Sequence, residues 1–549
     1  MKIPYHVLYV CGDVLFTARG CNIHSFSTRD GSHLSTWKYP NPAKIQGSEA
    51  VPTKEDAGSA AQSPAVEGNG DQEGPPAKRR KVDEEEADDA EQQGPSHDVG
   101  QGEQKTEGRR KSKKRGRKRS RPDVPPPKPA ELPLLQSLVA TSNGSHLVAV
   151  TGSDKTIWVF EHDGAGRLKE LSHRTMPKRP SSLVITPDDQ TILSADKFGD
   201  VYSLPLIPKD EFKRAASESS AASTRAATPA TPQPFKPRAT PLTVHTKRNL
   251  KALENQLLQT QQAPTAAAAE KPAAPQFEHT LLLGHVSMVT ALALGPHPTD
   301  PSSRYYIITG DRDEHIRVSR GPPQAHVIEN YCLGGHDEFV SRLCVLAPRR
   351  PDLLVSAGGD DALFVWAWRH GGPPLWKPTD LLSHVQAVVP GAEKVAVSAL
   401  RAARRADETW VVVICETVPA LFFFRLDDKS LQHAQTVRFA APPLDVAIAS
   451  QPTADKPNQD ARLYVSLDIS QAATQQHLAG EASNNPSGPP PQSSLLTLAW
   501  EDASSSWQPA PFAVGDDALD DGEADVSPES LQRSLYAIEP LRKMDYDDE

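Results

Sequence analysis

Two stretches of the chain contain the same pattern of residues, and this repetition constrains the fold more than any other feature. The first has Gly284-His285, a variable segment and then IITGDRDEHIRVS, which ends at Ser319. The second has Gly335-His336, another variable segment and then LVSAGGDDALFVW, which ends at Trp366. Alternating apolar residues on both sides of an aspartate-containing turn predict paired strands. A tandem repeat of this kind predicts an array of similar small sheets.

This pattern resembles the WD-repeat family, whose units are four-stranded blades of a β-propeller with a period of about 40–45 residues. Repeats of that family carry a hydrogen-bonded set of histidine, serine or threonine, aspartate and tryptophan. The second stretch supplies this set as His336, Ser356, Asp360 and Trp366, and the first as His285, Thr309 and Asp313, with Ser319 in place of the tryptophan. A hydrolase triad uses similar residues, but a catalytic site occurs once whereas these recur by blade. We interpret them as structural, because buried polar groups must be paired.

The same turn is predicted elsewhere in the chain. Asp154, Asp196, Asp313 and Asp360 each stand six residues before a residue of the following strand, namely Phe160, Tyr202, Ser319 and Trp366. This alignment predicts homologous blades. The fold expected is all-β, a seven-bladed WD-repeat propeller with long disordered insertions.

Composition divides the chain into blades and insertions, because the 51 prolines and the hydrophobic content of only 37% are unevenly spread. The expected order is a first blade at 1–39, a disordered insertion with acidic and basic clusters at 40–129, blades at 130–207, an Ala/Ser/Thr/Pro-rich disordered insertion at 208–276, the remaining blades at 277–515, and an acidic tail with a candidate closing strand at 516–549.

Two basic clusters stand in the first insertion. They contain Lys78, Arg79, Arg80 and Lys81, and then Arg109, Arg110 and Lys111 at the start of a run that ends at Arg121. Such clusters are typical of nuclear-import signals, which predicts a nuclear protein. They are also compatible with sequence-independent attraction to RNA phosphates, or with a solvated charge run neutralised by its acidic neighbour.

Signals for other protein classes are missing from the sequence. It contains no HExxH, GxSxG or phosphate-binding glycine loop, so a non-catalytic scaffold is expected. The five cysteines are scattered without a CxxC pair, which argues against a zinc site or a disulfide framework. The most apolar later segment, 410–424, contains Glu416 and Pro419 and is too short to cross a bilayer. We expect no membrane association.

Three segments show a closer resemblance. They are SADKFGDVYS at 194–203, GHVSMVT with TGDRDEHIRVSR between 284 and 320, and AHVIENYCLGGHDEFVSRLCV at 325–345; the ending LYAIEPLRKM is also similar. Together they resemble the non-catalytic WD-repeat subunit of the tRNA (guanine-N7-)-methyltransferase. That resemblance implies a heterodimer in which a separate Rossmann-type subunit binds S-adenosylmethionine and methylates N7 of a guanine in the tRNA variable loop. This chain would hold no cofactor, would stabilise the catalytic subunit, and would meet tRNA through the complex.

The resemblance also implies partner-binding residues. The matching lysine of the family pairs with an acidic residue of the catalytic subunit, and here it is Lys197. Further candidates on nearby loops are Lys178, Arg179, Arg312, Glu314 and His315. The alternative for Lys197 is a solvated turn lysine, and Arg312 could instead lock its own turn. Two other functions stay open at this point, a general nuclear scaffold for chromatin or ribosome assembly and a direct RNA-binding protein.

Overall fold

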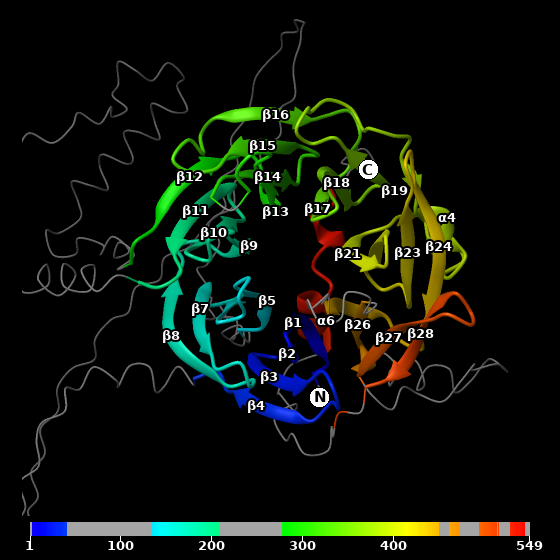
Figure 1. Ribbon diagram of the computed structural model, residues 1–549, viewed down its shortest axis with the longest axis horizontal. Coiled ribbons are helices and arrows are strands. Elements are labelled where there is room, and N and C mark those ends of the chain that lie inside the picture. The colour runs from blue at the N-terminus through cyan, green and yellow to red at the C-terminus, as the bar shows by residue number, and fades with distance from the viewer. Residues whose placement is uncertain are drawn as a thin grey trace, which may run out of the picture. The chain divides into compact units, whose positions relative to one another are not determined.

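The computed structural model describes residues 3–40, 133–208, 277–301, 303–449, 461–470, 494–512, 514 and 528–543. Its strands belong to one compact unit made of residues 1–40 and 130–549. Seven antiparallel sheets of four strands each form this unit, and they follow one another around a ring (Figure 1). The fold is therefore the expected seven-bladed β-propeller.

Blades 1 to 3 come from the first half of the chain. Blade 1 contains β1 Tyr5–Cys11, β2 Val14–Arg19, β3 Asn22–Ser27 and β4 His33–Trp37. Blade 2 contains β5 Leu135–Ala140, β6 His146–Thr151, β7 Thr156–His162 and β8 Leu168–Thr175. Blade 3 contains β9 Pro180–Ile185, β10 Thr191–Asp196, β11 Asp200–Pro205 and β12 Thr280–Gly284.

Blades 4 to 7 follow. Blade 4 contains β13 Val289–Pro296, β14 Tyr305–Asp311, β15 Ile316–Arg320 and β16 Ile328–Cys332. Blade 5 contains β17 Val340–Leu346, β18 Arg350–Gly358, β19 Ala362–Trp366 and β20 Thr379–Asp380, followed by helix α4 Leu382–Gln386. Blade 6 contains β21 Val397–Arg405, β22 Glu408–Cys415, β23 Ala420–Leu426 and β24 Leu431–Arg438. Blade 7 contains β25 Pro443–Ala449, β26 Arg462–Leu467, β27 Leu495–Glu501 and β28 Ser506–Pro511.

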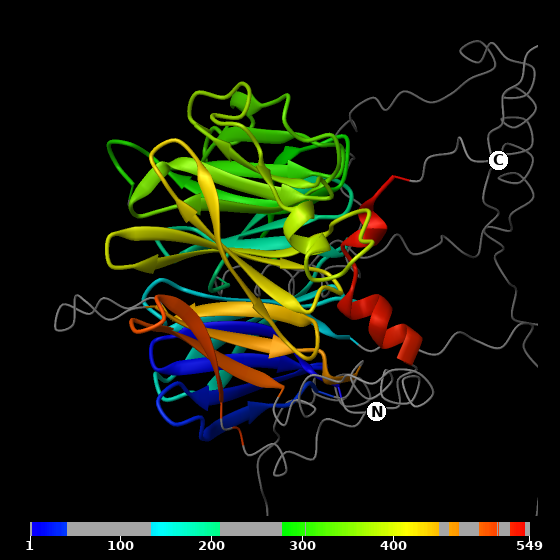
Figure 2. The same cartoon turned by 90° about the vertical axis from the view of Figure 1, so that its right-hand side faces the viewer.

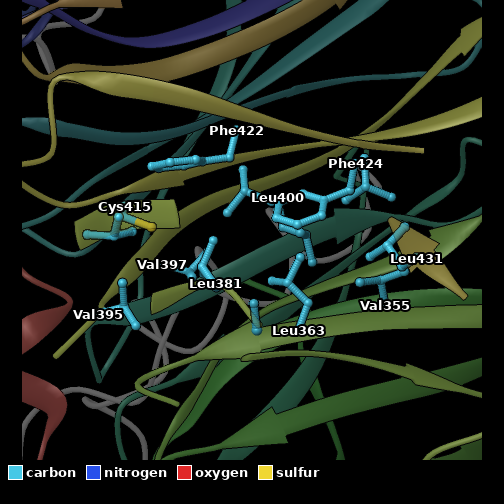
Figure 3. Packing of buried hydrophobic residues seen from close by; sticks show 14 of the residues in the cluster. Val355, Leu363, Leu381, Val395, Val397, Leu400, Cys415, Phe422, Phe424 and Leu431 are labelled. Carbon is cyan, nitrogen blue, oxygen red and sulfur yellow. The ribbon is translucent and has the colours of Figure 1, made fainter. Parts of the chain in front are cut away.

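The middle strands are largely apolar because both faces of each blade are covered by neighbouring blades. Along β22, Val411, Val413 and Cys415 pack toward blade 5, whereas Trp410, Val412 and Ile414 pack toward blade 7. Figure 3 shows the first of these interfaces, where Val355 and Leu363 of blade 5 meet Phe422 and Phe424 of blade 6. Successive side chains point to opposite faces of a strand, so every second residue serves one interface.

The second insertion lies inside a blade. We expected a new blade to begin at residue 277. Instead, β12 pairs with β11 and is the fourth strand of blade 3. Residues 208–276 therefore connect two neighbouring strands of the same sheet. The sequence did not show this, because the three consecutive leucines of this five-residue outer strand have no period-two alternation.

The closing strand expected within 516–549 is wrong for the part that the structure describes. Helix α6 Pro528–Leu535 and a 3-10 turn at Glu539–Leu541 occupy 528–541 instead. Pro528 begins the helix, Glu529 lies in its first turn, and Pro540 prevents a regular strand afterwards. This segment lies on one face of the ring and crosses its middle (Figures 1 and 2). No helix among the described residues is long and apolar enough to span a membrane.

Candidate functional site

The polar set expected in blade 5 forms as a buried network. Nδ1 of His336 lies 2.6 Å from Oδ2 of Asp360, and its Nε2 lies 2.6 Å from Oγ of Ser356. The indole N–H of Trp366 donates to the same hydroxyl at 2.7 Å. Oδ1 of Asp360 accepts the backbone N–H groups of Asp337 and Glu338. These side chains join the loop before β17 to β18 and β19, which is a structural task.

Blade 4 forms the corresponding network with a different aspartate. His285 lies 2.8 Å from the Thr309 hydroxyl and 3.0 Å from Oδ2 of Asp311, so the expected assignment of Asp313 is wrong. The other oxygen of Asp311 accepts the N–H groups of Asp313 and His315, which closes a five-residue turn. Burial acts to raise the pKa of Asp311, but the hydrogen bonds from His285 and from the His315 backbone bring it below the ordinary value.

Blade 3 has the same turn without a histidine. Asp196 pairs with Pro180 as Asp311 pairs with Val289, so Asp196 matches Asp311 rather than Asp313. Oδ1 of Asp196 accepts the N–H groups of Phe198 and Asp200. Oδ2 of Asp196 and Oγ of Ser194 are buried and have no hydrogen-bond partner. Burial raises the pKa of Asp196. In blade 4 the imidazole of His285 joins the equivalent carboxylate and hydroxyl groups, whereas in blade 3 no side chain joins them.

Above this turn lies a small surface that we call the blade-3 patch, made of Lys178, Arg179, Lys197 and Phe198. The Lys178 ammonium lies 3.9 Å from the centre of the Phe198 ring, and that of Lys197 lies 5.3 Å from it. The N–H of Lys197 donates to the Arg179 carbonyl, which joins the two loops. Phe198 is 52% exposed, although an aromatic ring of this size is usually buried.

The neighbouring loop of blade 4 adds an apolar residue beside the patch. Gly199 has a φ of +97°, and a Cβ there would lie 2.5 Å from the His285 carbonyl oxygen and 2.6 Å from that of Ser287. Val286, which stands between these two residues, is fully exposed. Cations over a ring, next to exposed apolar groups, form a surface suited to a protein with acidic and apolar residues.

The lysines of the patch differ from Lys543 on the same face, which forms ion pairs with Asp313 and Glu314. Among the described residues, no carboxylate lies within ion-pair distance of the Lys178 or Lys197 ammonium. Arg179 donates to the side-chain oxygen of Gln136 at 3.3 Å. Within the described residues, the two ammonium groups therefore have no ion-pair partner, and Lys178 acts only as a nearby charge on Asp196.

The other three predicted partner-binding residues stand in the β14–β15 turn of blade 4. Nε of Arg312 donates to the Leu541 carbonyl at 2.7 Å, and Glu314 lies 3.1 Å from the Lys543 ammonium. His315 lies 3.6 Å from Asp311. The C-terminal segment engages this turn, so Arg312 and Glu314 have partners within the chain. This interaction links residues far apart in the sequence, and no local pattern predicts it.

Two further expectations concern other parts of the chain. The nuclear-import candidates, from Lys78 to Lys81 and from Arg109 to Lys111, lie outside the described residues. Among the residues that the structure does describe, no group of histidine, cysteine, aspartate and glutamate side chains could hold a metal ion.

These observations define a class of protein, a WD-repeat propeller whose recurring polar residues hold its blades and which exposes a cationic and aromatic patch. Comparison with known proteins gives the family. Residues 15–487 match the model described as the tRNA methyltransferase TRM82 WD40 domain. The chain belongs to this family, and its relatives are named as the non-catalytic subunit of a tRNA (guanine-N7-)-methyltransferase.

Two curated relatives show the extent of the likeness. The subunit from Sclerotinia sclerotiorum is 41% identical over 457 residues, which cover 80% of this chain and 80% of the relative. The subunit from Coccidioides immitis is 42% identical over 402 residues, which cover 71% of this chain and 67% of the relative. Among solved structures, the RRP9 WD40 repeats match 85% of this chain and 88% of theirs at 12% identity with a TM-score of 0.44.

Proposed function

We propose that this chain binds the catalytic subunit of a tRNA (guanine-N7-)-methyltransferase through the blade-3 patch, in a heterodimer. The patch carries the proposal, because it holds cations over an exposed Phe198 ring without an acidic partner in the described part of the chain. The names of the relatives imply a separate catalytic subunit. S-adenosylmethionine would bind to that subunit, and tRNA would be methylated at a guanine of its variable loop by the complex.

The mechanism proposed is stabilisation by binding. A propeller that binds only the active conformation of its partner raises the population of that conformation. An exposed ion pair contributes only about 0–1 kcal/mol. Lys197 contributes more if docking removes it from water, since loss of one member of a desolvated charge pair costs about 2–5 kcal/mol. Phe198 and Val286 would supply the apolar contact that excludes water around that pair.

The test is methylation in cells. tRNA from cells that lack this protein should have lost N7-methylguanine from the variable loop, and the wild-type chain should restore it. Lys197→Glu should fail to restore it at equal expression. Lys429→Glu should restore it fully, because Lys429 lies in the exposed β23–β24 turn, at the end of the blade opposite to the β10–β11 turn. Unchanged methylation in cells without the protein would refute the function.

A nuclear location is a second proposal, and it rests on the basic clusters alone. Full-length protein carrying a fluorescent label should accumulate in the nucleus. Replacing Lys78, Arg79, Arg80 and Lys81 together with alanine, and Arg109, Arg110 and Lys111 likewise, should abolish that accumulation. If the substituted chain still accumulates, these clusters are not import signals.

A further inference from the structure

The ring closes without a strand shared between the two ends of the chain. Each of the seven sheets takes its four strands in sequence order, and β1 of blade 1 lies beside β25 of blade 7. Their junction is held by side-chain contacts. The N–H of Leu8 donates to Asp445 at 3.0 Å, and the Tyr464 hydroxyl donates to the Thr28 carbonyl at 3.1 Å. No sheet hydrogen bond crosses this junction, and one apolar cluster that contains Leu8 and Phe26 of blade 1 and Tyr464 of blade 7 packs across it.

The C-terminal segment, residues 528–543, begins across the next junction. In α6, Leu531 and Leu535 are four residues apart and therefore share one helix face. They pack on Ile3, which precedes β1, and on Leu134, which precedes β5. Leu531 is 1% exposed. The helix therefore attaches this segment to blades 1 and 2.

The middle of the segment is held by two buried carboxylates. The Tyr536 hydroxyl donates to Asp468 of blade 7 at 2.6 Å. The two oxygens of Glu416, in the β22–β23 turn of blade 6, accept the backbone N–H groups of Ile538 and Glu539 at 2.9 Å each. Burial raises the pKa of Glu416, and these two donors act against that shift. A buried carboxylate that accepts both donors fixes the path of the backbone.

The end of the segment is held by Arg542 and Lys543. The Arg542 guanidinium donates to the carbonyl oxygens of Gly359 at 3.0 Å and Val395 at 2.9 Å, and it pairs with Glu338 at 2.8 Å. Its side chain is only 10% exposed. The Lys543 ammonium then pairs with Asp313 and Glu314 of blade 4. A charged side chain that is buried and fully paired is a strong anchor.

These contacts reach blades 1, 2, 7, 6, 5 and 4 in turn, and none of them reaches blade 3. Figure 2 shows the segment, in red, along one face of the ring. Both Arg312 and Lys197 stand in turns between the second and third strands of their blades, so the blade-3 patch shares that face. Two hydrogen bonds connect the end of the segment to the patch. Arg312, which binds the segment at Leu541, donates its backbone N–H to the Met288 carbonyl. In the same blade 4 loop, the N–H of His285 donates to the carbonyl of Gly199, next to Phe198.

We propose that residues 528–543 form an intramolecular strap that holds the ring closed in place of a shared strand and leaves blade 3 as the open docking surface on this face. The first part depends on this chain alone. The second part rests on the proposed function, since it names the catalytic subunit as the molecule that docks there. The strap would also position the patch, through the hydrogen bonds that link Leu541, Arg312 and Met288 to the loop against Gly199.

Hydrogen exchange of the full chain tests the strap. Arg542→Ala removes its carbonyl hydrogen bonds and its ion pairs, and Tyr536→Phe removes only one hydroxyl. We expect Arg542→Ala to speed exchange about tenfold or more in peptides covering 536–543 and 311–315, and Tyr536→Phe to do so more weakly. Exchange along β1 and β25 should rise as well. Arg533→Ala, an exposed α6 residue, is the matched control and should change nothing.

Affinity for the catalytic subunit separates the two proposals. Arg542→Ala should weaken binding of the catalytic subunit, because the patch loses its support. If Arg542→Ala leaves hydrogen exchange unchanged in all these peptides, the strap is refuted, regardless of the affinity for the catalytic subunit. If exchange rises but Lys197→Glu leaves binding intact, the strap stands as the ring closure and the docking surface is refuted.

Discussion

Met176 in blade 3 occupies the position that His285 occupies in blade 4. Each stands four residues before the residue that pairs with the turn aspartate, Pro180 or Val289. Each also donates its backbone N–H to the preceding blade's turn, Met176 to Lys155 and His285 to Gly199. A thioether cannot replace the two hydrogen bonds of an imidazole. The proposed docking surface thus stands on a blade whose inner polar set is incomplete.

This difference predicts opposite effects of one substitution in two blades. Asp311→Asn removes an anionic acceptor from His285 and should lower the free energy of unfolding by about 1–3 kcal/mol. Asp196→Asn keeps the oxygen that caps its turn and removes a buried charge that forms no ion pair and that burial disfavours more than the nearby Lys178 stabilises it. We expect it to be neutral or stabilising. Denaturant unfolding of both variants gives the comparison, and a larger loss for Asp196→Asn would contradict the account.

Much of the fold follows from the sequence, because strand pairing within a blade is local. The Gly-His and aspartate pattern, the turn residues and the period-two alternation predict the blades and the network of His336. The error at Asp313 has a physical cause. The two turns have the same length, because the hairpins pair Gly310 with Ile316 and Ala195 with Val201. The equivalent of Tyr202 is therefore Arg317, and counting back from Ser319 instead placed the aspartate two residues too late.

The functional face was less predictable. The resemblance to a known family indicated Lys197, Lys178 and Arg179. The structure places the ammonium groups of Lys178 and Lys197 over the ring of Phe198, which no sequence pattern marked. The exposure of Phe198 could not be predicted, because an aromatic residue next to a strand is usually buried. The strap depends on contacts such as Arg542 with Gly359, which are 183 residues apart. Burial of a charged residue against a distant carbonyl leaves no periodic signal.

Gly199 should be intolerant of any side chain. Gly199→Ala would place Cβ 2.5 Å from a backbone carbonyl at a φ of +97°, and we expect a loss of about 1–3 kcal/mol of stability. Gly12→Ala is the matched control, because Gly12 also has a positive φ but nothing lies within 4 Å of its Cβ position. Thermal unfolding of both variants is the measurement. Equal losses would mean that the close approach of the blade 4 loop is unimportant.

Phe198→Ala should weaken partner binding without weakening the fold. An exposed aromatic side chain that becomes buried on docking contributes on the order of 2 kcal/mol, or about 30-fold in affinity. Leu281→Ala is the control, since Leu281 lies in the same blade on β12 and is 55% exposed, close to the 52% of Phe198. Titration calorimetry with the purified catalytic subunit compares them. A similar effect of both substitutions would argue against a specific patch.

Stability should fall in mild acid through His433. Its ring stacks on that of His384, with centroids 3.9 Å apart at an interplanar angle of 15°. Burial, and then the neighbouring charge of His384, lower the pKa of His433 from 6.5. A lowered pKa in the folded state means that this stability is present above 6.5 and is lost as pH falls through the folded value.

His433→Gln should therefore flatten the decline of the unfolding midpoint between about pH 7 and pH 5. Burial also lowers the pKa of His6, so His6→Gln should remove a separate part of the same decline. An unaltered pH profile in His433→Gln would show that the stacked pair does not titrate in this range.

Docking at blade 3 is tested by calorimetry of the full-length chain with the catalytic methyltransferase subunit, for wild type, Lys197→Glu and Lys429→Glu. We expect Lys197→Glu to weaken binding by about 30-fold or more at an unchanged melting temperature, because the reversed charge would meet an acidic surface. Lys429→Glu should bind as wild type does. Wild-type affinity in Lys197→Glu would contradict docking at blade 3.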